Sequence, residues 1–357
     1  MASPAEDAAM LRAIHLAARG LGGTSPNPVV GCVILDPAGS PVGEGFHAYA
    51  GGPHAEVEAL ARAGYSARGG TAVVTLEPCD HTGRTGPCTG ALLAAGIARV
   101  VVAVADPDPV AGGGAATLRS AGVEVELGVR AAQATAGNVA WLTATVRAAA
   151  GRPQPYVIWK CASTLDGRAA AADGTSKWIT SPAARADVHE LRSTVDAIVA
   201  GVGTVLADDA HLTVRAPDGT LADRQPLRVV VDSAARTPAN ARVRDNAAPT
   251  WVATAAEVGS TVDGYVDLRR LGAALYDRGC RRVLLEGGPT LAGAFLREGL
   301  VDEVVAYLAP KLLGAGPAAL GDIGVDTITD AVDLELVDVT RIGRDLRITA
   351  STRAKGA

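Results

Sequence analysis

One histidine, one glutamate and two cysteines stand out in the stretch 53-PHAEVEALARAGYSARGGTAVVTLEPCDHTGRTGPC-88. His54 precedes Glu56 by two residues, and Cys79 and Cys88 each follow a proline. Proline suits the first position of a helix, so we expect His54 and Cys88 in the first turns of two helices separated by a strand over residues 71–76. The positive end of a helix favours the thiolate that a metal needs. This helix–strand–helix pattern predicts an α/β fold built around a metal site.

The ligand types favour a catalytic zinc site. One histidine and two cysteines leave the fourth tetrahedral position to water, whereas structural sites usually have four protein ligands. A fourth protein ligand would have to be His81, Asp80 or His47. Glu56 is not needed as a ligand and is placed to move protons for a zinc-bound water. This order of residues is typical of zinc deaminases that act on nucleobase-type rings, although the loop between the two cysteines, at eight residues, is longer than the usual two.

The composition predicts an ordinary soluble chain. Its 357 residues suffice for two domains, and a net charge of −5 gives no reason to expect nucleic acid or an anionic membrane as a partner. The sequence has no apolar run of membrane-spanning length and no signal-peptide pattern. Five cysteines are too few for a disulfide framework in a chain of this length. We therefore expect a cytoplasmic protein.

Strands alternate with helices along both halves of the chain. Over residues 1–149 this alternation predicts a three-layer α/β/α sandwich. A short Gly/Pro-bearing linker follows, and the alternation restarts over residues 150–357. In this second domain we expect, among others, a strand around 265–268 and a strand over 282–285.

The second half lacks the Gly-x-Gly-x-x-Gly pattern of a Rossmann dinucleotide site. Instead, the strand over 282–285 runs into Glu286-Gly287-Gly288 and then a helix. Glycines before a helix leave backbone N–H groups free to bind phosphate. The same residues also suit a plain tight turn, and the pattern alone leaves both interpretations open.

Motifs in both halves resemble those of the RibD family of bifunctional riboflavin biosynthesis enzymes, and they occur along the chain in the order found in that family. In the first half they are 26-PNPVVG-31, 43-GEGFH-47 and 75-TLEPC-79. In the second they are 160-KCASTLDGR-168, 176-SKWIT-180, 204-TVLADD-209, 212-LTVR-215, 286-EGGPTLAGA-294 and 309-APKLLG-314. The resemblance implies a cytidine-deaminase-like domain with Zn²⁺, followed by a dihydrofolate-reductase-like domain with NADPH.

The resemblance also implies two successive reactions on one small molecule. The first is deamination of 2,5-diamino-6-(5-phosphoribosylamino)pyrimidin-4(3H)-one. The second is reduction of the ribosyl side chain of 5-amino-6-(5-phosphoribosylamino)uracil by NADPH. Members of this family usually associate through the reductase domain, so we expect a homo-oligomer.

Site residues follow from the matching positions. Metal ligands are His54, Cys79 and Cys88, and the catalytic candidates are Glu56, Lys160 and Glu286. Substrate contacts would be Asn27, His47, His81, Arg84, Ser176, Arg192, Leu212, Arg215 and Glu286. Cofactor contacts would be Ala162, Trp178, Thr204, Asp208, Ser233, Gly288, Pro289, Thr290, Leu291, Ala292, Gly293 and Ala294. Arg192 and Arg215 suit a ribose phosphate because guanidinium groups match phosphate with paired donors.

The chain departs from the family pattern at Asp80, at Asp108 and in the glycine-rich 112–114, where a basic residue is expected. Two added acids and one lost base predict weaker phosphate binding. Two rival hypotheses stay open at this point. One is a nucleotide deaminase fused to a dihydrofolate-type reductase, which would turn over dCMP or dihydrofolate. The other is a zinc-stabilised assembly module whose catalytic sites have decayed.

Overall fold

The computed structural model describes residues 1–81 and 86–352. The chain divides into two compact units, Met1–Pro153 and Gln154–Ala357. We describe each unit by itself. No helix in the described ranges is long and apolar enough to cross a membrane.

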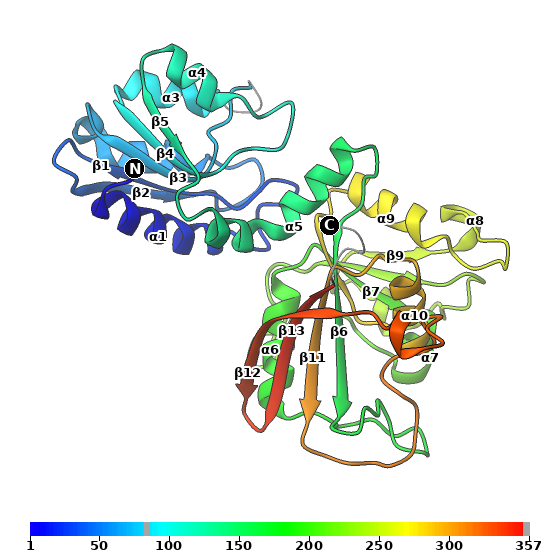
Figure 1. Ribbon diagram of the computed structural model, residues 1–357. Helices are drawn as coiled ribbons and strands as arrows, with labels where there is room; N and C mark the ends of the chain where they lie inside the picture. Colours follow the sequence, from blue (N-terminus) through cyan, green and yellow to red (C-terminus); the bar gives the residue numbers. More distant parts are fainter. Residues whose placement is uncertain (82–85, 353–357) are drawn as a thin grey trace. The chain divides into compact units, whose positions relative to one another are not determined.

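The first unit is a five-stranded sheet between two layers of helices (Figure 1). The strands, in the order β2-β1-β3-β4-β5 across the sheet, are β2 Pro41–Phe46, β1 Gly31–Leu35, β3 Thr71–Leu76, β4 Arg99–Val104 and β5 Glu124–Leu127. β1 runs antiparallel to both β2 and β3, while β3, β4 and β5 are parallel. The helices are α1 Pro4–Ala18, α2 Ala55–Ala63, α3 Cys88–Ala95, α4 Gly114–Ser120 and α5 Ala131–Ala149, with a short 3₁₀ helix at Gly64–Ala67.

Alternation along the strands builds the two faces of this sheet. In β1, Cys32 and Ile34 pack into a core shared with α2, α3 and α4. Val33 and Leu35 point the other way and pack into a second core with α1 and α5. A central strand that is apolar at every position therefore needs a helical layer on each side. The predicted α/β/α sandwich is confirmed.

The second unit is an eight-stranded sheet in the order β12-β13-β11-β6-β10-β7-β8-β9. Its strands are β6 Tyr156–Thr164, β7 Ala197–Gly201, β8 Leu227–Val231, β9 Thr250–Ala253, β10 Arg282–Leu285, β11 Glu303–Ala309, β12 Leu334–Ile342 and β13 Asp345–Thr352. Its helices are α6 Pro182–Ser193, α7 Val202–Asp208, α8 Ala255–Val258, α9 Leu268–Asp277 and α10 Pro289–Arg297, with 3₁₀ turns at Arg242–Arg244 and Ile328–Asp330. β6 to β11 are mutually parallel, and the β12–β13 hairpin joins antiparallel at one edge.

Two local expectations differ from the structure. The strand expected around 265–268 is only an isolated bridge at Val266, and α9 begins at Leu268. Asp267 ends the extended segment because its carboxylate accepts the N–H groups of Arg269 and Arg270 and caps the helix. The prolines before the metal ligands also lie further outside their helices than expected, since α2 begins at Ala55 and α3 at Cys88.

Candidate active sites

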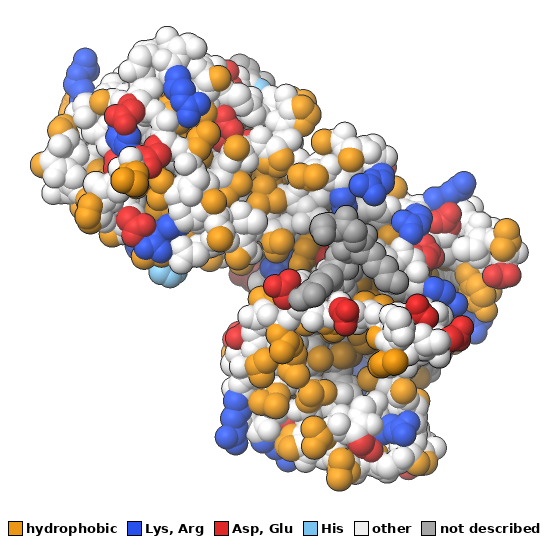
Figure 2. All heavy atoms as spheres, viewed as in Figure 1, with side chains coloured by type: hydrophobic (Ala, Val, Ile, Leu, Met, Phe, Trp, Pro, Cys, Tyr) orange, Lys and Arg blue, Asp and Glu red, His pale blue; other side chains and the backbone are white. Residues whose placement is uncertain are grey.

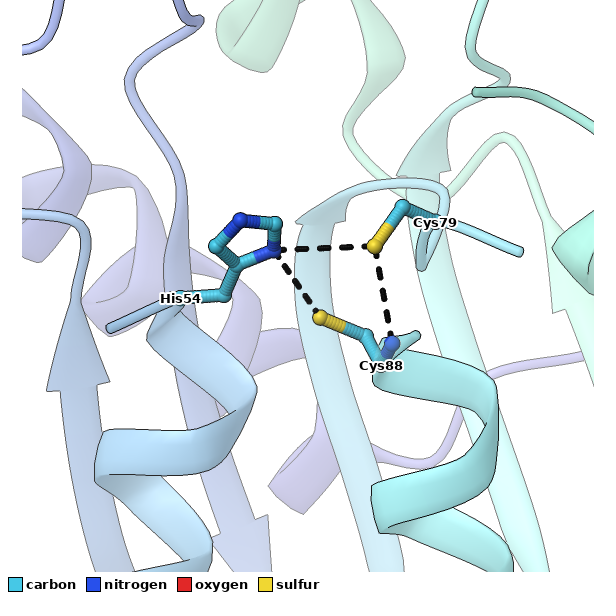
Figure 3. Close-up of side chains that lie close together, drawn as sticks. All are labelled: His54, Cys79 and Cys88. Carbon is cyan, nitrogen blue, oxygen red and sulfur yellow. Dashed lines mark hydrogen bonds between the residues drawn. The ribbon is translucent and has the colours of Figure 1, made fainter. Parts of the chain in front are cut away.

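Three side chains of the first unit converge where two helices begin and one strand ends (Figure 3). His54 is the N-cap of α2, Cys79 follows β3, and Cys88 is the first residue of α3. The Nδ1 atom of His54 lies 3.1 Å from the Sγ atom of Cys88 and 3.6 Å from that of Cys79. All three ligand atoms lie within 4.8 Å of one another.

The 3.6 Å between His54 and Cys79 fits zinc, and the 3.1 Å between His54 and Cys88 is somewhat shorter than a zinc site requires. Bond lengths of about 2.0–2.3 Å in a tetrahedral arrangement separate neighbouring ligand atoms by roughly 3.5–3.8 Å. Hydrogen bonds from Cys88 and His54 lower the pKa of Cys79 to about 4, which favours the thiolate form. Among the residues that the structure describes, the cluster contains these three groups alone. A three-ligand set leaves room for a water or a substrate atom.

Glu56 lies in the first turn of α2, two residues from His54. Its side chain is buried, with 3% of the residue exposed, and burial raises the pKa of its carboxyl group. An acid with a raised pKa holds a proton more readily than an ordinary carboxyl group, and beside a metal site it can accept and return one. The geometry therefore places a proton carrier at the three ligands.

Asn27 and His47 come together beside His54. The Nδ2 atom of Asn27 lies 3.3 Å from Nε2 of His47, and Nδ1 of His47 lies 2.9 Å from the carbonyl oxygen of Pro53. The carbonyl requires Nδ1 to be the donor, so Nε2 accepts from Asn27. Burial lowers the pKa of His47 and favours this neutral form. Both ring nitrogens are thus used, which argues against the predicted phosphate contact by His47 and favours a role in orienting Asn27.

The loop after Cys79 contains the two other predicted phosphate contacts. His81 is half-buried, and its Nδ1 atom has no hydrogen-bond partner within the described part of the chain. Arg84 lies outside the described residues, which resume at Gly86.

Asp80 anchors the Cys79 turn. Its carboxylate accepts hydrogen bonds from Thr89 Oγ1 at 2.7 Å and Thr117 Oγ1 at 2.6 Å, which ties the turn to α3 and α4. The sequence suggested instead an acid that repels the substrate phosphate. With two hydroxyl donors on it, Asp80 has a clear structural task of its own.

Buried Glu77 was not singled out from the sequence, although it directly precedes Pro78-Cys79. Its two carboxylate oxygens accept the N–H groups of Ala115 at 2.8 Å and Asp106 at 3.0 Å. It therefore fixes the start of α4 against the end of β3. Next to it, a Cβ at Gly114 would lie 1.8 Å from the carbonyl oxygen of Pro78, so only glycine fits there.

The predicted site residues of the second unit gather at one edge of the sheet. β6, β10, β7 and β8 are adjacent and parallel, so their carboxyl ends share this edge. Ala162 lies near the end of β6, Thr204 and Asp208 follow β7 in α7, Ser233 follows β8, and Glu286 directly follows β10. Ligands of open α/β sheets typically bind at such an edge.

Glu286 is the centre of a buried charge cluster. Arg192 donates to its two oxygens through Nε at 2.6 Å and Nη2 at 2.9 Å, and Lys160 Nζ lies 3.7 Å from Oε2. Nη1 of Arg192 donates to the carbonyl of Thr213. Burial by itself would raise the pKa of Glu286, but Arg192 and Lys160 outweigh it and lower this pKa to about 2.

These contacts change two expected roles. Glu286 engages the Nε and Nη2 donor pair of Arg192, so this pair is not available as the phosphate clamp that the sequence suggested. An ionised Glu286 has no proton to donate at neutral pH. Within the described part of the chain, Arg215 in contrast forms a side-chain hydrogen bond through Nη1 alone, which donates to the carbonyl of Gly219 at 2.8 Å. Its backbone N–H donates to Nδ1 of His189 on α6.

The segment that contains Ser176 and Trp178 lies against neighbouring elements. Trp178 is 62% exposed, and the guanidinium of Arg185 lies 4.2 Å from its ring centroid. Lys177 pairs with Asp208 at 3.5 Å, which connects this segment to α7. Leu212 is buried and adopts a φ of 51°. A large exposed aromatic ring and a helix end thus flank the carboxyl edge of the sheet.

The start of α10 fits a nucleotide phosphate. Gly288 is the N-cap, no side chain caps the helix among the described residues, and Pro289 occupies the first turn. A Cβ at Gly288 would meet nothing within 4 Å, so the approach is open. The first N–H groups of a helix have no partner within the helix. In α10 these groups belong to Thr290 and Leu291. The residues of this unit therefore suit the diphosphate of NADPH.

Comparisons with known proteins cover both units. Residues 4–104 match the family described as the cytidine and deoxycytidylate deaminase zinc-binding region, and residues 155–348 match the RibD C-terminal domain. The riboflavin biosynthesis protein RibD of Mycobacterium tuberculosis is 48% identical over 97% of both chains. The Escherichia coli RibD is 44% identical over 94% of this chain and 96% of its own. The chain belongs to the RibD family.

Solved structures agree with this assignment. Acinetobacter baumannii RibD has a TM-score of 0.87 at 39% identity and covers 98% of this chain and 99% of its own. A Thermotoga maritima diaminohydroxyphosphoribosylaminopyrimidine deaminase/5-amino-6-(5-phosphoribosylamino)uracil reductase has a TM-score of 0.87 at 34% identity, with the same coverage. The chain thus combines a cytidine-deaminase-like zinc domain with an NADPH-type reductase domain.

Membership in the RibD family also decides between the hypotheses left open by the sequence. The second unit matches the RibD reductase family over nearly its whole length, which disfavours an ordinary dihydrofolate-type reductase. The first unit retains its donor set and a buried Glu56, which disfavours a decayed assembly module. The chain is a bifunctional deaminase and reductase of riboflavin biosynthesis.

Proposed function

We propose that this chain deaminates 2,5-diamino-6-(5-phosphoribosylamino)pyrimidin-4(3H)-one and then reduces the product's ribosyl group with NADPH. The observation that carries this proposal is the pairing of two different sites in one chain. The first unit brings His54, Cys79 and Cys88 together beside a buried acid, and the second surrounds Glu286 with cations. A ribose phosphate common to both substrates gives both sites the same group to recognise.

In the first reaction, His54, Cys79 and Cys88 hold zinc. When bound, zinc would act as a Lewis acid and lower the pKa of a coordinated water to near neutral pH. Glu56 would pass one proton of the attacking water to the ring nitrogen and the second to the departing amine, which leaves as ammonia. Asn27, oriented by His47, contacts the substrate ring or sugar. His81 and Arg84 are the proposed contacts to the substrate phosphate in this unit.

In the second reaction, the residues at the carboxyl ends of the parallel strands would hold NADPH, and the first N–H groups of α10 would bind its diphosphate. When bound, the cofactor would supply a hydride to the sugar carbon bonded to nitrogen, after the bond from that carbon to the ring oxygen has broken, the N–H proton has passed to this oxygen and a carbon–nitrogen double bond remains. Since Glu286 is ionised, it holds Arg192 and Lys160 in place, and Lys160 supplies the proton to that nitrogen. Ser176, Leu212 and Arg215 hold the substrate, and Arg215 contacts its phosphate.

The test is a reaction followed by mass. Purified protein loaded with zinc should raise the mass of the diaminopyrimidine substrate by about one unit, as an amine is replaced by oxygen. Addition of NADPH should then raise it by about two more units, as hydride and a proton are added. Turnover of dCMP or dihydrofolate instead of this substrate would overturn the proposal.

A homo-oligomer forms, in this proposal, through the β12–β13 edge. β12 exposes Leu336 at 67% and Val339 at 54%, and Leu346 on β13 is 40% exposed. In Figure 2, hydrophobic side chains gather over this edge of the sheet. Large apolar side chains that continue along one sheet face are typical of an interface.

The register shows which face they occupy. Leu336 pairs with Ala350 and Val339 with Ile348, so these four residues share one face. Ile348 pairs in turn with Ala306, which packs against the core under α9 and α10. The exposed residues are therefore the continuation of a core-forming face, and a second copy of the same edge is the natural cover.

We expect Leu336→Asp to shift the protein toward a smaller species in sedimentation velocity, because a charge would be buried at the interface. Val262→Asp is the matched control, since Val262 is fully exposed in a loop away from this edge. A wild-type monomer, or an unchanged assembly in Leu336→Asp, would refute this interface.

A further inference from the structure

His189 lies on α6 among the charged residues of the reductase site. Its Nδ1 atom accepts the backbone N–H of Arg215 at 3.1 Å. The same helix contains Arg192, which binds Glu286. A lone histidine in a sequence is most simply an ordinary surface or core residue, and nothing in the sequence marked this one. The contact with Arg215 gives it a specific function.

The hydrogen bond fixes the form of the imidazole. An N–H donor can only approach an unprotonated Nδ1, so the ring carries its hydrogen on Nε2. The charged groups around His189 come from four elements: Arg192 on α6, Arg215 after α7, Lys160 on β6 and Glu286 after β10. Burial and the three cations lower the pKa of His189 below its usual 6.5, against the opposing effect of Glu286. The neutral ring is therefore the stable form beside Arg215.

We propose that His189 is a positioning residue for substrate binding in the reductase site, and that it acts by holding the backbone of Arg215. This inference rests on the proposed function, in which Arg215 contacts the ribose phosphate. Arg215 is then held at two points, because its side chain also donates to the carbonyl of Gly219. Residue 215 lies outside the named helices and strands, and its backbone also pairs with Leu221 in an isolated bridge, so the His189 contact adds to this pairing in deciding where the guanidinium points.

Two substitutions separate positioning from packing. His189→Leu fills similar space but removes the acceptor, and leaves the N–H of Arg215 unpaired. His189→Asn places Oδ1 near the position of Nδ1 and keeps an acceptor. At pH 8 we expect His189→Leu to raise the KM for the deaminated intermediate about tenfold, with kcat and the KM for NADPH within about twofold. His189→Asn should recover most of that loss.

The pH dependence gives a second, independent readout. As pH falls through the lowered pKa of His189, the ring gains a second N–H and can no longer accept from Arg215. The wild-type KM should therefore rise in acid. The substrate phosphate also titrates near pH ~6, but it affects the wild type and His189→Asn equally. The ratio of the KM of His189→Asn to that of the wild type should fall as the pH is lowered through the depressed pKa of His189, below 6.5.

The outcomes are distinguishable. If the wild type does not oxidise NADPH with the intermediate, the proposed function fails. If the wild type is active but His189→Leu keeps its KM, or His189→Asn does not recover the loss, His189 has no positioning role. Ammonia release by the first unit, expected to be unchanged in both variants, reports that the chain is folded.

Discussion

Glu56 and Glu286 are both buried acids at a proposed active site, yet their surroundings push them in opposite directions. Glu56 is 3% exposed and has a raised pKa, because burial dominates. The side chain of Glu286 is 7% exposed, but Arg192 and Lys160 lower its pKa to about 2. A carboxyl group with a raised pKa can take up and return a proton more readily, whereas one that is ionised at neutral pH holds cations. In the proposed mechanism, the same residue type thus serves proton transfer in one unit and fixed charge in the other.

The largest expected effect comes from Glu56→Gln. Glutamine keeps the shape and a hydrogen-bonding oxygen but cannot carry a proton, so we expect ammonia release to fall about 10³-fold. Bound zinc, measured by elemental analysis, should stay at one ion per chain because the ligands His54, Cys79 and Cys88 are untouched. NADPH oxidation with the deaminated intermediate should stay within about twofold.

The reductase activity is the internal control for that variant, since Glu56 and the second unit's cluster belong to separate units. Survival of ammonia release in Glu56→Gln would show that another group carries the proton. Loss of zinc together with activity would show that Glu56 supports the metal rather than the chemistry.

Glu286→Gln should affect the other unit by a different route. It leaves Arg192 and Lys160 without a counter-charge in a buried position, which destabilises a protein by about 3 kcal/mol. We expect NADPH oxidation to fall about 10²-fold because Arg192 and Lys160 lose their fixed position. Ammonia release should stay within about twofold, and chemical denaturation followed by circular dichroism should show the reductase unit unfolding earlier.

The difference in stability between the wild type and Glu286→Gln should depend on pH, because the pKa of Glu286 is lowered in the folded protein. The pKa of Glu286 is depressed from 4.5 to about 2, so its stabilising effect is present above 4.5 and is lost as pH falls toward 2. The stability gap between the wild type and Glu286→Gln should therefore narrow in acid. A gap that is constant down to pH 2 would mean that the carboxylate charge is not what matters.

The two sites also differ in how far the sequence could predict them. His54 and Cys88 lie 34 residues apart and belong to one helix–strand–helix segment, so their spacing alone indicated a zinc site. Arg192 and Glu286 lie 94 residues apart, and only the order of strands in the sheet brings them together. Sequence motifs placed both residues at the reductase site but could not show that they bind each other.

Roles were harder to predict than positions. His47 was expected to contact a phosphate, but its partners Asn27 and Pro53 use both ring nitrogens. Such partners depend on side-chain orientation, which residue spacing does not specify. The strand expected around 265–268 failed for a local reason, since the cap at Asp267 starts a helix there. His189 left no signal because its contact is to a backbone N–H.

Asp80 provides the smallest and sharpest test, because its sequence and structural interpretations disagree. A repelling acid predicts that Asp80→Asn lowers the KM for deamination. An anchor bonded to Thr89 and Thr117 predicts a KM within about twofold, but zinc loss to a chelator about threefold faster, because an amide accepts with only one oxygen. Asp108→Asn is the matched control, since Asn can still accept the N–H of Val110. Faster zinc loss in Asp80→Asn but not in Asp108→Asn would show that Asp80 anchors the turn that contains Cys79. A lower KM in both variants would instead support the hypothesis that these acids repel the substrate phosphate.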